Sequence, residues 1–512
     1  MPAYLHPGVY LEEIGSGARP VDAVATSVTV FVGEAPRGPI ATPTLAHSQD
    51  DYEAVFGSLA SATDTMGLAA GAFYRNGGKD AYFVRVADPT AANTKPAALD
   101  LDGETATKVV TVSASSEGTW GNAVFIRVRK PAATDTSFAL DVGHKVKRNG
   151  VDVFIVDETF AGLTLTDGDA RFAPGVVNTS SRLVQLKLNS ATGGLPKAFP
   201  TGTADSAALT GGTAGAAGAA DYRAAFARLE KVRDISIIVL PGKSMAANGS
   251  GNAAVAEAVS HCNKVGNRMV IIDPPPGTEL TTSAAVDALS LPTTSYSALY
   301  YPWITVPNPF YNADSNPTAP RTLTVAPSAF AAALWSRTDG RRGVWKAPAG
   351  VEAQLVGAAG LEFEVGDGDQ DQLNPAGVNC VRKLPSFGAV IWGARTLATN
   401  AEPPWRYIPV RRTAIMIEQS IYNGIQWAVF EPNDHRLWSS LRVNVGAFMD
   451  NLFRAGAFQG EKASDAYFVR CGLGDTMAQD DIDRGQVIVV VGFAPLKPAE
   501  FVIVRIQQKT QQ

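Results

Sequence analysis

Helical and strand patterns alternate between residues 221 and 304, and this alternation constrains the fold more than any other feature. Asp221–Asp234 has apolar side chains at helical spacing, and further helical stretches lie near Asn252–Lys264 and Ser283–Ser290. Three mostly apolar runs, ISIIVLPG, NRMVIIDPPP and SALYYPWI, separate and follow these stretches. Such a β-α-β-α-β series predicts a parallel sheet with helical crossovers.

Residues 27 to 87 have the same character. Ser27–Ala35 is typical of a buried strand, and Ser48–Gly57 predicts a short helix with an N-cap serine and a glycine stop. A second helical stretch near Thr65–Asn76 leads to the apolar run AYFVRVA. Helices that alternate with apolar strands indicate an α/β layer structure.

The composition changes between residues 89 and 218. Small and polar residues dominate there, with short alternating runs (TKVVTVSA, VFIRVRK, VDVFIVDETF and SRLVQLKL) that predict the strands of an inserted β-rich domain. A chain of 512 residues also exceeds what one core usually serves. We therefore predict an α/β and α+β multidomain chain: an N-terminal arm at 1–22, a mixed α/β core domain at 23–88 and 219–400, the β-rich insertion at 89–218, a C-terminal α+β domain at 401–496 and a C-terminal arm at 497–512.

The last fifty residues contain strands without a complete sheet of their own. Ala466–Leu473 and Gln486–Ala494 predict an antiparallel pair with open edges. A third run, Glu500–Gln508, follows Pro495 and Pro498, which prevent a tight hairpin, so we expect it to complete the sheet of a neighbouring copy. The expected donor residues are Phe501, Val502, Ile503, Val504 and Ile506, and the expected recipient residues are Tyr467, Val469, Val487, Val489 and Val491.

A second extended arm is predicted at the N-terminus. Val9, Tyr10 and Leu11 lie in an alternating run, and GSGARP follows with the Gly and Pro of a flexible exit. If each arm adds to a different neighbour, the contacts are heterologous and generate rings or helical lattices. The alternative is that both arms fold back onto their own domain.

Enzyme-like signals are confined to residues 236–276. Gly242–Ser244 (GKS) follows a predicted strand, as in a phosphate-binding loop, but Ile237 stands where that motif needs a glycine. GSGNAA resembles a dinucleotide-binding loop with Asp273 near the place of a ribose-binding acid, yet eight residues separate its glycines from the strand. An ordinary Gly-rich loop is the preferred interpretation, and a nucleotide-binding α/β enzyme is the rival from another class.

The remaining patterns indicate neither a metal site nor catalysis. Asp367–Asp371 has the alternating acids of a calcium loop but lacks its glycine and glutamate, so a solvated acidic loop is predicted. The five histidines and three cysteines show no ligand spacing. We expect no metal, no cofactor, no catalytic residue and no enzymatic activity.

Charge and hydropathy argue against two further classes. The chain carries 44 Lys and Arg against 49 Asp and Glu, a net charge of −5, which gives no basic footprint for nucleic acid. The N-terminus lacks the basic and apolar regions of a Sec signal peptide, and the longest apolar run is far shorter than a membrane span. We expect neither nucleic-acid binding nor direct membrane insertion.

Two long helices are predicted near the C-terminus. Arg411–Phe430 has isoleucines at helical spacing, and His435–Phe458 places its apolar side chains on one stripe. Four basic residues lie off this stripe or beyond it: Arg436, Arg442, Arg454 and Lys462.

Several motifs together resemble contractile tail sheath proteins. They run in family order over nearly the whole chain: PGVYLEE from Pro7, TSVTVFVGEAPRGP from Thr26, GGKDAYFVRV from Gly77, EGTWGN from Glu117, SALYYPWI from Ser297, RRGVWKAPAG from Arg341, GVNCVRKLPSFGAVIWGART from Gly377, WRYIPVRR from Trp405 and FEPND from Phe430. The family includes the sheaths of contractile phage tails and of phage-tail-like injection systems.

This resemblance implies a structural subunit that polymerises into a helical sheath around an inner tube and contracts to drive the tube through a target envelope. It implies an outer position for the β-rich insertion, and charge contacts of Arg436, Arg442, Arg454 and Lys462 with the tube. The implied partners are further copies of the chain, the tube protein, and baseplate and terminal cap proteins. The implied location is a phage tail or a phage-tail-like particle assembled in the bacterial cytoplasm. A baseplate or tube component, or a polymer that cannot contract, remains an alternative.

Overall fold

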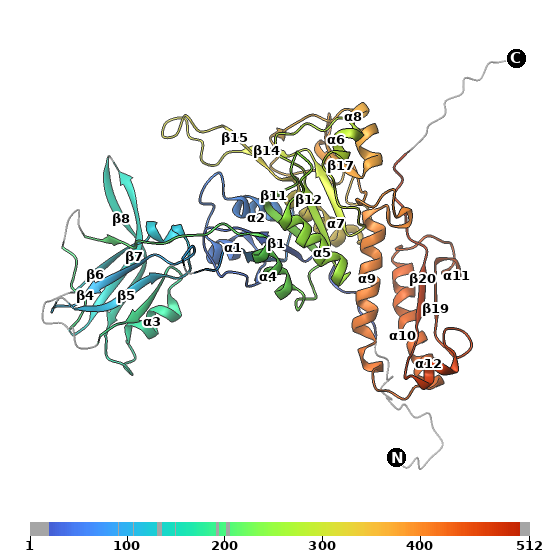
Figure 1. The fold of residues 1–512 in the computed structure, drawn as a ribbon, viewed down its shortest axis with the longest axis horizontal. Helices are drawn as coiled ribbons and strands as arrows, with labels where there is room; N and C mark the ends of the chain where they lie inside the picture. The colour runs from blue at the N-terminus through green and yellow to red at the C-terminus, as the bar shows by residue number, and fades with distance from the viewer. Residues whose placement is uncertain are drawn as a thin grey trace, which may run out of the picture. The chain divides into compact units, whose positions relative to one another are not determined.

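The computed structural model describes residues 20–501 except 91, 106, 131–135, 149, 191–193 and 201–204 (Figure 1). The described residues fall into two compact units. One, the sheet unit, comprises Ala25–Arg412 and the residues from Pro498 onward; the other, the helix unit, comprises the residues up to Val24 and Thr413–Lys497. The domain boundaries expected from the sequence stay predictions.

An eight-stranded sheet organises the sheet unit, in the order β18-β17-β13-β12-β11-β1-β3-β2. The six central strands are parallel, and β2 and β18 are antiparallel at the two edges. The parallel sheet predicted from the alternating pattern is therefore confirmed. The strands are β1 (Thr29–Gly33), β2 (Thr44–Ala46), β3 (Ala81–Arg85), β11 (Ile237–Ser244), β12 (Met269–Asp273), β13 (Ser297–Tyr301), β17 (Val378–Leu384) and β18 (Gly388–Ile391).

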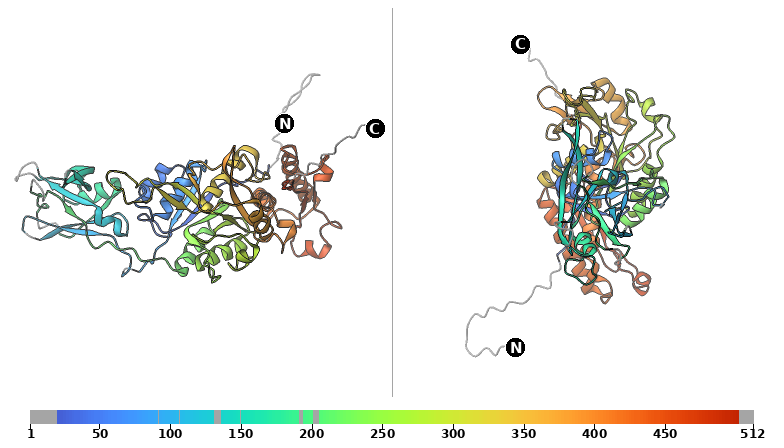
Figure 2. Two further views of the ribbon diagram at one scale, coloured as in Figure 1. Left: turned by 90° about the horizontal axis from the view of Figure 1, so that it is seen from above. Right: turned by 90° about the vertical axis from the view of Figure 1, so that its left-hand side faces the viewer.

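Helices cover both faces of this sheet (Figures 1 and 2). Val30 and Val32 of β1 pack in one cluster with residues of α4 and α5, whereas the Phe31 ring between them lies 5.2 Å from that of Phe73 in α2. Because both faces are buried, the central strands read as continuous apolar runs. The helices are α1 (Gln49–Phe56), α2 (Thr65–Arg75), α4 (Ala219–Leu229), α5 (Ala253–Val265), α6 (Ser283–Asp287), α7 (Pro327–Arg342) and α8 (Asp367–Leu373).

Two local predictions have different outcomes. The helix α1 begins after Ser48, whose side chain accepts a hydrogen bond from Asp51 N, and ends at Gly57, as predicted. The prediction of an acidic loop at Asp367–Asp371 is wrong, because these residues form part of the helix α8. Its Asp369 side chain accepts a hydrogen bond from Gly366 N, so an acid near the helix start takes the role of a capping-box residue.

Residues 98–208 form two further sheets that share one core. A three-stranded sheet has the order β4-β5-β9 and a four-stranded sheet the order β10-β6-β7-β8. One cluster unites Val112 of β5, Ile126 of β6, Leu140 of β7 and Val184 of β9. The elements are β4 (Ala98–Asp102), β5 (Lys108–Ala114), β6 (Phe125–Arg129), β7 (Phe138–Arg148), β8 (Val151–Leu163), α3 (Ala173–Ser180), β9 (Val184–Leu188) and β10 (Ala207–Ala208).

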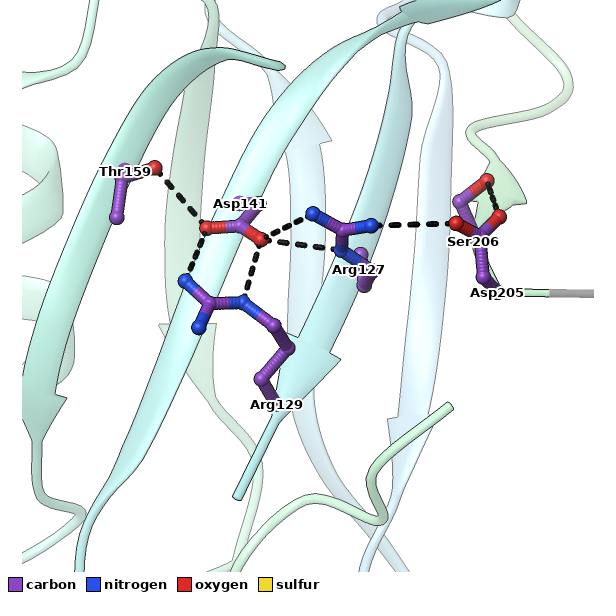
Figure 3. A network of polar contacts seen from close by, with 6 residues as sticks. All are labelled: Arg127, Arg129, Asp141, Thr159, Asp205 and Ser206. Atoms are coloured by element: carbon purple, nitrogen blue, oxygen red, sulfur yellow. Dashed lines mark hydrogen bonds and ion pairs between the residues drawn. The ribbon is translucent and has the colours of Figure 1, made fainter. Parts of the chain in front are cut away.

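A buried carboxylate ties three strands of the larger sheet together (Figure 3). Asp141 of β7 accepts hydrogen bonds from Arg127 and Arg129 of β6 at 2.7 to 3.0 Å and from Thr159 of β8 at 3.0 Å. Burial by itself raises the pKa of Asp141, but these hydrogen bonds outweigh it and the pKa is lowered. The charged form is thus held in the fold as a structural link.

The helix unit is built on two long helices. In α10 (His435–Arg454) the predicted stripe from Leu437 to Leu452 is buried, and Asp434 caps the start. The helix α9 (Ile408–Gly424) ends six residues before the predicted end at Phe430. The remaining elements of the unit are α11 (Ala463–Ala466), β19 (Tyr467–Arg470), α12 (Gln479–Asp483) and β20 (Val490–Phe493), and the sheet unit also contains β14 (Ile304–Pro307), β15 (Thr322–Val325) and β16 (Gly360–Leu361).

Candidate assembly surfaces

Two chain segments contact each other at the place where a doubly wound sheet usually binds ligands. Strand order reverses between β1 and β11, and ligands of such folds sit at the carboxyl ends of these strands. Here Lys243 Nζ lies 3.1 Å from Glu34 Oε1, and a Cβ added at Gly33 would meet Pro241 O at 3.0 Å. The GKS residues were predicted to form a loop after a strand. They lie within β11 instead.

The glycine-rich loop before α5 is likewise used for the fold. The Asn252 side chain accepts hydrogen bonds from Ala254 N at 2.9 Å and Val255 N at 3.4 Å, and it donates to Ser244 O at 2.9 Å. A Cβ added at Gly249 would meet Ala288 O at 2.4 Å. The amide groups that would hold a pyrophosphate therefore already bind the chain's own cap.

Asp273 caps a helix from a distant strand. Its carboxylate accepts hydrogen bonds from Ser328 N at 2.9 Å and Ser328 Oγ at 2.6 Å, at the start of α7, where the N-cap residue Ala326 has no capping side chain. Asp273 is buried, and burial raises its pKa to about 7, although the hydrogen bonds from Ser328 oppose the shift. The acid considered for ribose binding thus serves the core.

No group of three or more His, Cys, Asp or Glu able to hold a metal ion occurs among the residues that the structure describes. His261 stacks on Phe226 with ring centroids 5.1 Å apart, and burial lowers its pKa to about 4. Cys262 beside it is buried and free. In the same described part of the chain, no helix is long and apolar enough to cross a membrane.

The strand pair of the helix unit is an isolated sheet. Within the described residues β19 and β20 pair only with each other, antiparallel, with Tyr467 opposite Phe493 and Val469 opposite Val491. Two-stranded sheets are marginal in water, and unpaired strand edges can accept a further strand. Tyr467, Val469 and Val491 of the predicted recipient set therefore lie in a two-stranded sheet, and their role as recipients stays a prediction.

The second predicted recipient strand is shorter than expected. It was predicted from Gln486 to Ala494, but β20 begins at Val490, so Val487 and Val489 lie outside it and pack against the buried cluster that includes Leu437. The carbonyl groups of this segment accept hydrogen bonds from side chains and not from a neighbouring strand. Asn433 Nδ2 donates to Gln486 O at 3.0 Å, and Thr476 Oγ1 donates to Ile488 O at 2.8 Å.

One face of the strand pair packs inward and the other is exposed. Tyr467 and Phe493 both lie near Phe458, with ring centroids 6.3 and 5.5 Å away. On the other face the Phe468 ring crosses Gly492, where any added Cβ would meet it at 2.3 Å, and Arg470 lies over that ring at 5.1 Å. Gly492 is therefore needed for the position of Phe468.

Both ends of the described chain are tied to buried side chains. Next to the N-terminal end, Val24 N donates to Ser420 Oγ at 3.0 Å within the helix unit. In the sheet unit, Thr26 Oγ1 donates to Asp339 at 2.6 Å, and Asp339 is bound by both Nη atoms of Arg412 at 2.9 and 2.6 Å. The predicted N-terminal donors, Val9, Tyr10 and Leu11, lie outside the described residues.

At the C-terminal end, Glu500 forms an ion pair with Arg395, and the next residue, Phe501, is 75% exposed. Of the predicted C-terminal donor residues only Phe501 is described. The others lie outside the described residues: Val502, Ile503, Val504 and Ile506.

The four basic residues predicted to face a tube are all exposed, but two of them already have partners. Arg454 forms an ion pair with Asp450 at 2.7 Å, and Arg442 donates to the carbonyl of Cys471. Exposed pairs of this kind are worth about 0 to 1 kcal/mol, so both side chains can exchange partners at low cost. Arg436 and Lys462 are exposed in the same unit.

Sequence reasoning missed a strained aromatic residue beyond α9. Phe430 has φ +69° and is fully exposed. We expect Phe430→Gly to stabilise the helix unit by about 1 kcal/mol, because glycine adopts this conformation without strain and no burial is lost. The adjacent Val429 has φ −69°, so Val429→Gly should instead destabilise the unit. Urea unfolding of both variants measures this, and equal signs would contradict the prediction.

An α/β core whose candidate nucleotide-binding residues serve the fold, a separate strand pair and anchored chain ends indicate a structural protein. It belongs to the phage tail sheath protein family, as the motifs predicted. The sequence model of the phage tail sheath protein central domain matches residues 215–397, and that of the phage tail sheath C-terminal domain matches residues 400–509, together more than half of the chain.

Individual relatives agree with this assignment. The tail sheath protein of Burkholderia phage BcepMu is 27% identical over 477 residues, which cover 90% of this chain and 89% of that protein. A chain of the anti-feeding prophage baseplate structure is 25% identical, with a TM-score of 0.59, 99% of this chain and 100% of that chain covered. The contracted helical sheath of the anti-feeding prophage, 24% identical, has the same fold, with a TM-score of 0.60 and the same coverage.

Proposed function

We propose that the chain polymerises into a helical sheath around an inner tube, and that the sheath contracts to drive the tube through a target envelope. The observation that carries this proposal is the isolated β19–β20 pair in a member of the sheath family. A subunit with an incomplete sheet is suited to being completed by its neighbours. The contracted state that the anti-feeding prophage sheath adopts supports the second half of the proposal.

In this proposal two arms complete the sheet of other copies. The N-terminal donor residues are Val9, Tyr10 and Leu11, the C-terminal donors run from Phe501 to Ile506, and the strands that receive them are β19 and β20. Each added backbone hydrogen bond contributes a net of roughly 1 kcal/mol, and apolar burial adds to it. Such links would hold neighbouring copies together while the packed surfaces of the subunits change.

The proposal also places the parts of the subunit. The insertion at 89–218 lies on the outside, and the C-terminal domain at 401–496 lies on the inside with Arg436, Arg442, Arg454 and Lys462 toward an acidic tube surface. Weak exposed ion pairs would let the sheath release the tube during contraction. The sheath would assemble in the bacterial cytoplasm with tube, baseplate and terminal cap proteins, and it would perform no chemistry of its own.

Contraction requires a subunit that packs in two ways against its neighbours, with the assembled extended state metastable. Imaging the purified protein together with its tube should reveal hollow helical rods of two distinct diameters, the wider being shorter. Rods of one diameter under all conditions, including after heating or mild denaturant, would favour a polymer that cannot contract. Closed rings without rods would favour a baseplate role, the alternative suggested by the baseplate relative.

A further inference from the structure

We propose that Arg395, Tyr407 and Glu500 form an anchor that fixes the start of the C-terminal arm on the sheet unit. This proposal rests on the proposed function, because the anchor matters only if the following residues bind another copy. The anchor would transfer the pull of a neighbouring subunit to the eight-stranded sheet, and it would set the direction in which the arm leaves.

The contact itself is close and shielded. Arg395 Nε donates to Glu500 Oε1 at 2.9 Å and Nη2 to Oε2 at 2.5 Å, so the carboxylate is held by two parallel hydrogen bonds. The two side chains are 9% and 15% exposed. Tyr407 Oη donates a third hydrogen bond to Oε2 at 3.2 Å. The hydrogen bond to Glu500 raises the pKa of Arg395. A shielded pair of this kind is screened by salt much less than a surface pair.

The sheet holds Arg395 in position before the arm arrives. Asn379 of β17 is buried, and its side chain accepts a hydrogen bond from Arg395 N at 2.6 Å and donates to Arg395 O at 2.8 Å and to Leu299 O of β13 at 3.0 Å. Arg395 Nη1 also donates to Asn374 O at 3.1 Å. A force on Glu500 therefore acts on two parallel strands of the central sheet.

The anchor lies between the end of β20 and the first donor residue, so it shortens the free part of the arm. The last strand of the helix unit, β20, ends at Phe493, and Glu500 seven residues later already belongs to the sheet unit. The first donor residue, Phe501, follows Glu500 directly. Without the anchor the arm would begin near Ala494, and the longer free segment would lower its effective concentration at the neighbouring sheet.

Other ion pairs of the sheet unit offer a matched control. Glu230, the C-cap residue of α4, and Lys264 of the neighbouring helix α5 are 2.7 Å apart, but their side chains are 35% and 66% exposed. Such a pair contributes little to stability and fixes no chain end. The substitution Glu230→Gln therefore removes the same charge as Glu500→Gln from the same unit without releasing the arm.

The test compares wild type, Glu230→Gln, Glu500→Gln and Tyr407→Phe by the critical concentration for polymerisation. We expect Glu500→Gln to raise it about tenfold, because the longer free segment lowers the effective concentration of the arm, and Tyr407→Phe to raise it about threefold, because the ion pair with Arg395 remains. The Glu230→Gln protein should match wild type. The melting temperature of each unassembled protein should stay within about 2 °C of wild type, a shift that a change in core packing would exceed.

A second measurement keeps the anchor testable in the unassembled protein. The mobility of a spin label attached at Ala499→Cys should increase in Glu500→Gln and not in Glu230→Gln, because Glu500 fixes the chain next to the label and the three native cysteines are buried. Equal mobility, or a critical concentration equal to wild type in both Glu500→Gln and Tyr407→Phe, would overturn the anchor. A wild-type protein that never polymerises would contradict the proposed function instead, and the mobility measurement would then decide on the anchor alone.

Discussion

Deletion of residues 502–512 is expected to leave a folded protein that no longer polymerises. The strands of the central sheet lie between Thr29 and Ile391, and β19 and β20 end at Phe493, so the deletion removes none of these strands. Glu500 and its anchor also remain. What is lost is the proposed donor strand, with several backbone hydrogen bonds and the apolar side chains of each intersubunit link. Sedimentation should therefore detect monomer at concentrations where wild type forms rods.

A matched pair of substitutions tests strand donation in a chain of full length, where no residue is deleted. Val504→Pro removes a backbone N–H and cannot continue a strand ladder, whereas Val504→Thr keeps a β-branched side chain and the N–H. We expect the proline variant to behave like the deletion and the threonine variant to polymerise. Normal rods from the deleted protein, or from the proline variant, would contradict the exchange of strands between copies.

The parts of the fold that were predictable are those with a local sequence signal. The parallel strands read as apolar runs because both their faces are buried, and the α10 stripe from Leu437 to Leu452 repeats at helical spacing. The end of the helix α9 was predicted six residues too late, because apolar spacing continues beyond it. Its last residue, Gly424, packs against Val21, a contact between residues about 400 positions apart in the sequence.

The contacts that carry the proposals have no such local signal. Arg395 and Glu500 are 105 residues apart, and nothing in either neighbourhood indicates that they pair. Asp273 looked like a ribose-binding acid because it ends a strand, and only the fold places it at the start of α7. The sequence predicts that Asp273 lies at the end of a strand. It does not predict the partner of Asp273, because that partner depends on packing between distant segments.

Asp273 is also expected to make the stability of the sheet unit depend on pH. Its folded pKa of about 7 lies above the ordinary value of 3.8, so an unfolded chain releases the proton first as the pH rises. The contribution of Asp273 to stability is therefore greatest below about pH 4, falls by about 1.4 kcal/mol per pH unit as the pH rises toward 7, and stays low above it, a total cost of about 4 kcal/mol.

Asp273→Asn should remove that cost. The amide oxygen can still accept from Ser328 N and the amide nitrogen can donate to Ser328 Oγ, so the variant should gain about 4 kcal/mol over wild type at pH 8 relative to their difference at pH 4. Urea unfolding of both proteins in the arm-deleted background measures it. Asp434 provides the opposite case: backbone hydrogen bonds from Leu437 and Arg436 lower its pKa, so Asp434→Asn should lose stability relative to wild type as the pH rises from about 2 to about 4. The same sign for both substitutions would show that burial does not govern the charge of Asp273.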